Sequence, residues 1–113
     1  MKIIDKKISE KELQEMAKKS FGNLVKAVVD IEKEIMAVDA ELHSDEEELL
    51  LKQGSLQENL WGINLYANEP PDKIIEFDSM INLRPSFGNR SRGVDDPKIR
   101  KRIIEIVQKL VQK

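Results

Sequence analysis

The sequence predicts an α+β fold in two layers: a mainly antiparallel sheet of about four strands, two amphipathic helices on one of its faces and one short helix. Segments with helical spacing of apolar residues alternate with segments rich in β-branched residues. The connections between successive predicted strands are short, which favours antiparallel pairing. With 113 residues, 40% hydrophobic and 35% charged, the chain fits a single domain over residues 1–113.

Two helices are expected from capping boxes, in which a serine is followed three residues later by a glutamate. One box begins at Ser9 and predicts a helix over residues 9–21, and the other begins at Ser44 and predicts a short helix over residues 45–53. A glycine follows each segment, as is common after a helix C-terminus.

A third helix is expected at the C-terminal end. Asp96 is a suitable N-cap residue, and Pro97 is favoured in the first turn. Its apolar stripe consists of Ile99, Ile103, Ile106, Val107 and Leu110. Together with the helix at residues 9–21, it is enough to cover one face of a sheet.

Residues 24–43 allow two interpretations. Their apolar residues follow a four-three spacing that would suit a long helix. They also crowd β-branched residues together and alternate them with charged ones, which favours strands. We therefore predict two strands, at about residues 24–31 and 35–43.

Two further strands are expected in the second half of the chain. In residues 61–66, Trp61, Ile63 and Leu65 would share one face. Residues 74–84 alternate most clearly between apolar and polar side chains, and a proline-rich break separates the two strands. A small additional strand is expected at Ile3-Ile4.

The composition restricts the possible function classes. The chain has no cysteine, which excludes disulfides, thiolate metal sites and a cysteine nucleophile, and fits a reducing compartment. Its first residues lack the apolar segment of a signal peptide, and no apolar run approaches membrane-spanning length. We expect a cytoplasmic protein that does not associate with a membrane.

The charges are distributed unevenly along the chain. Residues 1–83 contain ten Lys and Arg against eighteen Asp and Glu, whereas residues 84–113 contain nine against three. One explanation is that the basic tail packs beside the acidic body of the same molecule. The alternative is that an anionic partner binds the tail.

A candidate metal site follows from the predicted strands. If the second strand extends to residue 43, Asp39, Glu41 and His43 share a face, and Asp78 is expected to join them from the strand at residues 74–84. Carboxylates beside an imidazole could ligate a divalent cation, the one cofactor that we infer, or act as general acid and base. The alternative is a solvated polar face, which antiparallel sheets commonly present.

A candidate anion site lies in the arginine-rich segment at residues 84–92. Its members are Arg84, Asn89, Arg90, Ser91 and Arg92. Guanidinium groups bind carboxylates and phosphates through paired hydrogen bonds. The alternative is a structural role, in which the arginines pair with acidic residues of the sheet and the polar residues form a turn. The segment matches no known phosphate-binding loop, and the chain lacks a nucleic-acid-binding motif, so nucleic acid is the weaker partner hypothesis.

Five separated motifs occur in order along the chain: E-L-H-S-D-E (41–46), G-S (54–55), L-W-G-I-N-L-Y (60–66), I-N-L-R-P (81–85) and G-N-R-S-R (88–92). They resemble a family of small prokaryotic proteins described as a domain of unknown function. The resemblance covers nearly the whole chain and implies a cytoplasmic prokaryotic protein of one domain. It implies no activity, ligand or catalytic residue.

Three functional hypotheses follow, and they leave open whether the protein is an enzyme. The first is a non-enzymatic module that binds an anionic small molecule or protein through residues 84–92. The second is a metal-assisted hydrolase of a phosphate-containing substrate. The third is a homo-oligomeric subunit in which the acidic body of one copy meets the basic tail of another.

Overall fold

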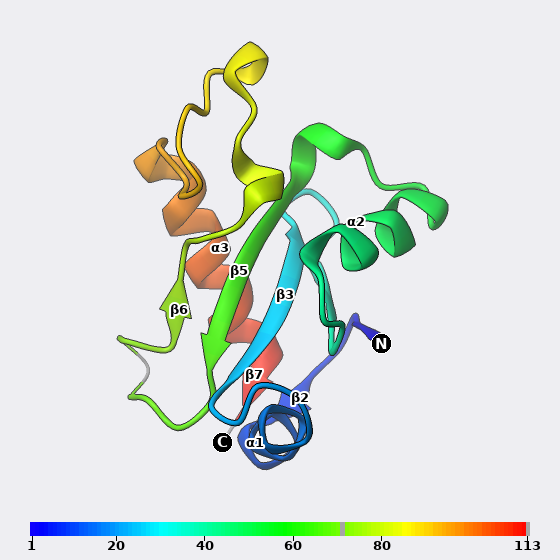
Figure 1. The fold of residues 1–113 in the computed structure, drawn as a ribbon, viewed down its shortest axis with the longest axis vertical. Helices are drawn as coiled ribbons and strands as arrows, with labels where there is room; N and C mark the ends of the chain where they lie inside the picture. Colours follow the sequence, from blue (N-terminus) through cyan, green and yellow to red (C-terminus); the bar gives the residue numbers. More distant parts are fainter. Residues whose placement is uncertain (71, 113) are drawn as a thin grey trace.

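A five-stranded antiparallel sheet forms the centre of the molecule in the computed structural model, which describes residues 1–70 and 72–112 (Figure 1). Every neighbouring pair in it is antiparallel. Its strands, in spatial order, are β1 (Lys2–Ile4), β4 (Ile35–Val38), β3 (Leu24–Asp30), β5 (Leu60–Tyr66) and β6 (Ile75–Glu76). The α+β class and the antiparallel pairing predicted from the sequence are confirmed, with five strands rather than about four.

Helices pack on both faces of this sheet. The elements outside it are α1 (Glu10–Lys19), α2 (His43–Lys52), α3 (Pro97–Leu110), the short parallel pair β2 (Ile8–Ser9) and β7 (Val111–Gln112), and the 3-10 helices η1 (Gln57–Asn59), η2 (Met80–Asn82) and η3 (Pro85–Phe87). The apolar stripes of α1 and α3 pack against one face, as predicted. Leu50 of α2 packs on the other face, against Val28 and Leu60. The expected two layers therefore become three where α2 covers the sheet (Figure 1).

The predicted caps of α1 and α3 are confirmed. The Ser9 hydroxyl accepts a hydrogen bond from the backbone N–H of Glu12, and the Asp96 carboxylate accepts one from Lys98. The short helix α2 differs from its prediction, because it begins at His43 rather than at Ser44 or later. Its N-cap residue is Leu42, which has no side chain able to cap the helix.

The choice of strands over a long helix for residues 24–43 is confirmed, since β3 and β4 pair directly with each other. The second strand is shorter than predicted. It ends at Val38, because Asp39 adopts a left-handed backbone conformation with φ of 70° that a continuing strand does not allow. The prediction of strand structure up to residue 43 is therefore wrong.

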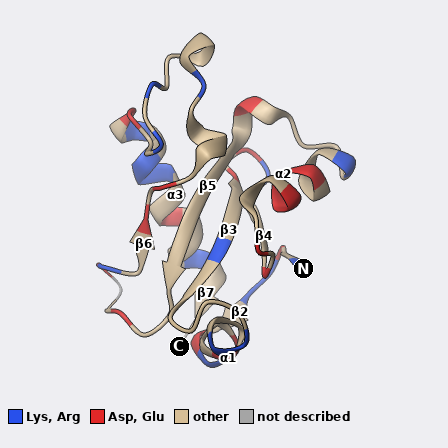
Figure 2. Ribbon diagram, viewed as in Figure 1, with Lys and Arg blue, Asp and Glu red and all other residues tan. Residues whose placement is uncertain are grey.

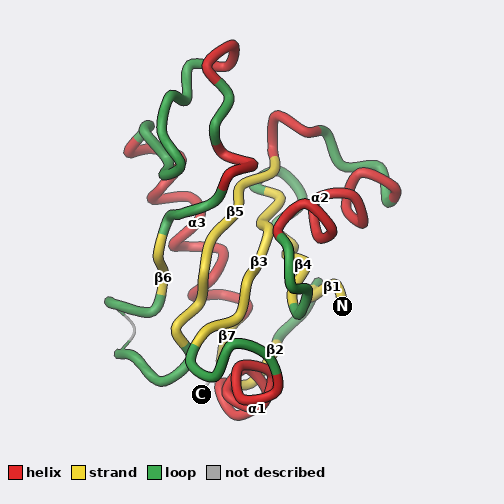
Figure 3. Tube along the Cα trace, in the orientation of Figure 1, coloured by secondary structure: helices red, strands yellow, loops and turns green. Residues whose placement is uncertain are grey.

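The strand predicted over residues 74–84 is also mostly wrong. Only Ile75–Glu76 pairs as a strand. After it, the chain continues through loops interrupted by the 3-10 helices η2 and η3, drawn green and red in Figure 3. Strand β6 pairs only with Asn64 and Leu65 of β5, and at Gly62 a side chain supplies the hydrogen bonds that a neighbouring strand would otherwise make. The Asn82 carboxamide accepts a hydrogen bond from the backbone N–H of Gly62 and donates one to the Gly62 carbonyl. This amide takes the place of a neighbouring strand at that point.

No helix in the described part of the chain is both long and apolar enough to cross a membrane.

Candidate functional site

A pocket of about 310 Å³ lies on the face of the sheet that α2 partly covers. Its wall combines one position each from β3 and β5, the start of α2 and the segment that follows β6. The residues around it are Lys26, Leu42, His43, Ser44, Asn64, Asp78, Ser79, Met80, Ile81 and Arg92. A pocket of this size is at the lower end of the range for small-molecule sites, about 300–1,000 Å³.

Lys26 and Asn64 are brought together by strand register. They are direct partners in the antiparallel pair of β3 and β5, so their side chains share one face. The Asn64 amide group donates hydrogen bonds to the Glu76 carboxylate (2.9 Å) and to the Asp78 carbonyl (3.4 Å). Both partner atoms can only accept hydrogen bonds, so the amide nitrogen of Asn64, which carries the hydrogens, must be the atom that faces them. The Asn64 side-chain oxygen, Oδ1, is buried and has no hydrogen-bond partner among residues 1–70 and 72–112.

His43 is the first residue of α2 and its ring is almost fully buried. Its Nε2 lies 2.7 Å from the carbonyl oxygen of Ile63. A carbonyl only accepts, so Nε2 carries the proton and Nδ1 is an acceptor when the ring is neutral. Burial lowers the pKa of His43, which keeps the ring neutral at pH 7. His43 therefore anchors α2 to the sheet beside the pocket.

Two cations and one carboxylate contribute charge to the pocket wall. Arg92 Nε pairs with Asp78 Oδ1 at 2.8 Å. Lys26 has no carboxylate within ion-pairing distance among the described residues. Its ammonium group lies 5.1 Å from the centre of the Phe21 ring, in a cation–π contact. The charges of Arg92 and Asp78 offset each other, so Lys26 leaves the pocket wall with one positive charge in excess.

The N-terminus of α2 adds to this positive potential. The first backbone N–H groups of a helix have no partner within the helix, and the helix dipole places partial positive charge there. Leu42 provides no side-chain cap, and the start of α2 at His43 and Ser44 lies at the pocket wall. The positive end of the helix dipole is therefore located beside the pocket.

Glu46 lies one turn further along α2 and is completely buried. Its Oε2 accepts a hydrogen bond from the backbone N–H of Ala40 (3.1 Å), and its Oε1 has no hydrogen-bond partner in the described part of the chain. Burial raises the pKa of Glu46 to about 9, so the carboxyl group is uncharged at neutral pH. It therefore does not offset the positive charge of the neighbouring pocket.

The arginine-rich segment is largely occupied by contacts within the protein. Arg84 donates hydrogen bonds to the carbonyls of Gln57 (2.6 Å) and Leu60 (2.7 Å), and its guanidinium group stacks 4.4 Å from the centre of the Trp61 ring. Asn89 donates to three backbone carbonyls, those of residues 82, 91 and 93. For these two residues the contacts match the structural role rather than a ligand-binding one.

The remaining members of that segment differ from one another. The Ser91 hydroxyl bonds the Asp95 carboxylate, which also accepts from the backbone N–H of Arg90. The Arg90 side chain is exposed, away from the pocket wall. Arg92 is the one member of the predicted anion site that the structure places at the pocket.

The four predicted metal ligands do not come together. Asp39 lies in a shallow depression beside α1, Glu41 borders a separate pocket, and only His43 and Asp78 share the polar pocket. Among residues 1–70 and 72–112, no three carboxylate or imidazole side chains lie close enough to hold one metal ion. The grouping fails because β4 ends at Val38, so the expected alternation along residues 39–43 does not exist.

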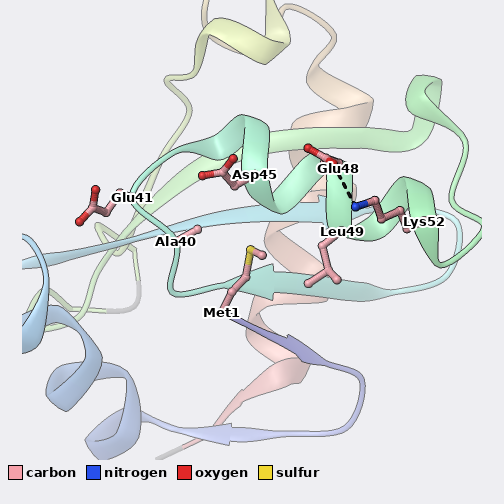
Figure 4. Close-up of a pocket in the computed structure, with 7 residues that line it drawn as sticks. All are labelled: Met1, Ala40, Glu41, Asp45, Glu48, Leu49 and Lys52. Carbon is pink, nitrogen blue, oxygen red and sulfur yellow. Dashed lines mark ion pairs between the residues drawn. The ribbon is translucent and has the colours of Figure 1, made fainter.

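A second pocket of about 390 Å³ lies between the chain start and α2 (Figure 4). It is bordered by three carboxylates. Figure 4 shows Glu41 at one end of this pocket and Lys52 at the other, with Glu48 paired to Lys52 at 3.0 Å. Its carboxylates do not converge on one point, so it is the weaker candidate.

Sequence reasoning missed Lys26 and the apolar residues Leu42 and Met80 of the pocket wall. Lys26 was visible as one of two charged residues, with Asp30, in the strand predicted over residues 24–31. Its pairing with Asn64 depends on the register of β3 and β5, which the sequence pattern did not give.

The family assignment rests on a match that extends over almost the whole fold. A family model described as "Protein of unknown function (DUF5674)" matches residues 2–110. The chain belongs to this family. The expectation that the chain belongs to a family of unknown function is thereby confirmed. The comparisons with curated proteins and with solved structures gave no match. The DUF5674 assignment brings no activity, so functional inference depends on the pocket.

Proposed function

We propose that the protein binds a small organic anion in the pocket between α2 and residues 78–92. The observation that carries this proposal is Lys26, a cation without a carboxylate partner among the described residues, at the wall of a pocket that also contains Arg92. An anion there would gain charge-assisted hydrogen bonds from Lys26 and Arg92. The proposal keeps the anion-binding hypothesis and moves its centre from residues 84–92 to this pocket.

Asn64 places a fixed polar side chain at the same wall. It is only 8% exposed, and its amide group is held by the Glu76 carboxylate and the Asp78 carbonyl. A ligand in the pocket therefore meets a neutral polar surface beside the two cations.

The proposal is tested by titrating the isotope-labelled protein with sodium acetate and with sodium phosphate, and following backbone amide signals by NMR. We expect saturable shifts at residues 42–44, 64 and 79. Lys26→Met keeps the alkyl stem of the side chain and removes its charge. We therefore expect the apparent affinity for each anion, measured from these shifts, to fall at least tenfold. Arg92→Ala is expected to lower it as well.

Arg90→Ala is the matched control, because Arg90 lies in the same loop but outside the pocket. It should leave the titration unchanged. Shifts that scatter over the surface, or that respond equally to Arg90→Ala and Lys26→Met, would contradict the proposal.

A further inference from the structure

The rim of the polar pocket carries two exposed apolar side chains. Leu42, at the start of α2, is 55% exposed, and Met80, at the start of η2, is 62% exposed. Single exposed apolar residues are common on protein surfaces. Here two of them border the same charged pocket, one from the start of α2 and one from the segment that follows β6, and Ile81 adds a third apolar side chain.

The two rim residues suit an apolar group of variable shape. Methionine is unbranched and flexible, so it adapts to different ligand surfaces. The pocket therefore offers charge inside and apolar surface at its edge. A ligand that used both would carry an anionic head and an apolar chain.

The charge of the pocket restricts the head group. Lys26 and Arg92 contribute two positive charges, and Asp78 contributes one negative charge. The remaining single positive charge matches a monoanion, whereas a phosphate monoester close to its dianionic form would also be repelled by Asp78. A carboxylate fits this balance.

We propose that the ligand is a small amphiphilic monocarboxylate, with its carboxylate beside Lys26 and Arg92 and its apolar chain across Leu42 and Met80. This proposal rests on the anion site proposed above and specifies the chemical class of its ligand. The polar pocket orients the head, and the rim selects for the chain.

The test compares acetate, butyrate and hexanoate, with inorganic phosphate as a head group without a chain. We expect the dissociation constant, measured from the amide shifts of residues 42–44, 64 and 79, to fall with each added methylene by up to about fourfold. The double variant Leu42→Ala, Met80→Ala removes most of the apolar surface without adding a polar cap at the start of α2, so it is expected to remove the chain-length dependence.

Leu56→Ala is the matched control, because Leu56 is as exposed as Leu42 (55%) and lies outside the pocket. It should leave the chain-length dependence as in the wild type. Equal affinity for acetate and hexanoate, or a chain-length dependence that survives the double variant, would overturn the proposed ligand class while leaving the anion site intact. Absence of pocket shifts with every one of these anions would instead overturn the anion site itself.

Discussion

At the scale of single residues, the region beside the pocket depends on buried groups that stay uncharged. Glu46 is 0% exposed, and burial raises its pKa to about 9. Burial has the opposite effect on the pKa of His43, which it lowers. Both shifts favour the neutral form, since burial penalises charge in either kind of group. The two residues should therefore limit stability at opposite ends of the pH range.

For Glu46, we expect the free energy of unfolding to fall as pH rises from 7 to 9. The folded-state pKa lies above the unfolded value near 4.5, so the favourable contribution is complete below 4.5 and is lost as pH rises through about 9. The slope should approach about 1.4 kcal/mol per pH unit. His43 contributes little in this window, because an imidazole with the ordinary pKa of 6.5 is mostly deprotonated above pH 7 and burial lowers the pKa further in the folded state.

The measurement is urea unfolding at several pH values between 7 and 9. Glu46→Gln keeps the shape of the side chain without a titrating proton and should flatten the profile. Glu48→Gln is the control, because Glu48 is an exposed residue of the same helix. Parallel profiles for the wild type and Glu46→Gln would show that Glu46 does not cause the pH dependence of the free energy of unfolding.

At the scale of elements, the segment after β6 is held by close contact with β5. The Asn82 carboxamide bonds both backbone groups of Gly62, and Ser79 packs directly above that glycine. A Cβ at position 62 would lie 2.5 Å from the Ser79 Cβ and 2.6 Å from its Oγ. The glycine is therefore needed for the approach of η2, and this segment carries Ser79, Met80 and Ile81 to the pocket wall.

We expect Gly62→Ala to lower the free energy of unfolding by about 1–3 kcal/mol, because the backbone around Ser79 has to move to make room. The added methyl group also displaces the pocket wall. Gly22→Ala is a useful contrast: that glycine has φ of 92°, but a Cβ added there would meet nothing within 4 Å, so it tests backbone strain without a clash. Amide shifts at residues 79–82 in Gly62→Ala alone would confirm the mechanism, and unchanged shifts there would contradict it.

At the scale of the whole molecule, part of the charge asymmetry along the chain is neutralised inside the fold. Glu34, in the turn between β3 and β4, pairs with Lys109 at 3.0 Å and with Arg102 at 3.3 Å, both on α3 (Figure 2 shows the basic positions of this helix). Lys109 and Arg102 lower the pKa of Glu34. These pairs favour the explanation that the basic tail packs beside the acidic body. Self-association through the remaining charges stays a prediction.

We expect Glu34→Lys to lower stability at low salt, because three cations would then lie together. Raising the salt concentration should reduce the difference from wild type, since exposed charges are screened over a Debye length of about 8–10 Å. Urea unfolding at 20 mM and 500 mM sodium chloride measures this. Glu58→Lys is the control, as Glu58 is exposed and forms no ion pair among the described residues. An effect of equal size at both salt concentrations would contradict the electrostatic explanation.

Features that depend on local chemistry could be predicted from the amino-acid sequence. The caps at Ser9 and Asp96, the β-branched strand at residues 24–30 and the alternation of Trp61, Ile63 and Leu65 all rest on interactions between near neighbours, and each is found in the structure. Where an element stops was harder to foresee. Asp39 ends β4 through its backbone conformation, and Asn82 substitutes for a strand at the edge of β5.

Which polar residues come into contact depends on the three-dimensional fold and could not be predicted from local patterns. Lys26 and Asn64 are separated by 38 positions and become neighbours through the register of two strands, while Asp39 and His43, four positions apart, border different depressions. Arg84 looked suited to a ligand, yet its guanidinium group holds the carbonyls of Gln57 and Leu60. Residue type sets what a side chain can bind, but burial and register set what remains within its reach.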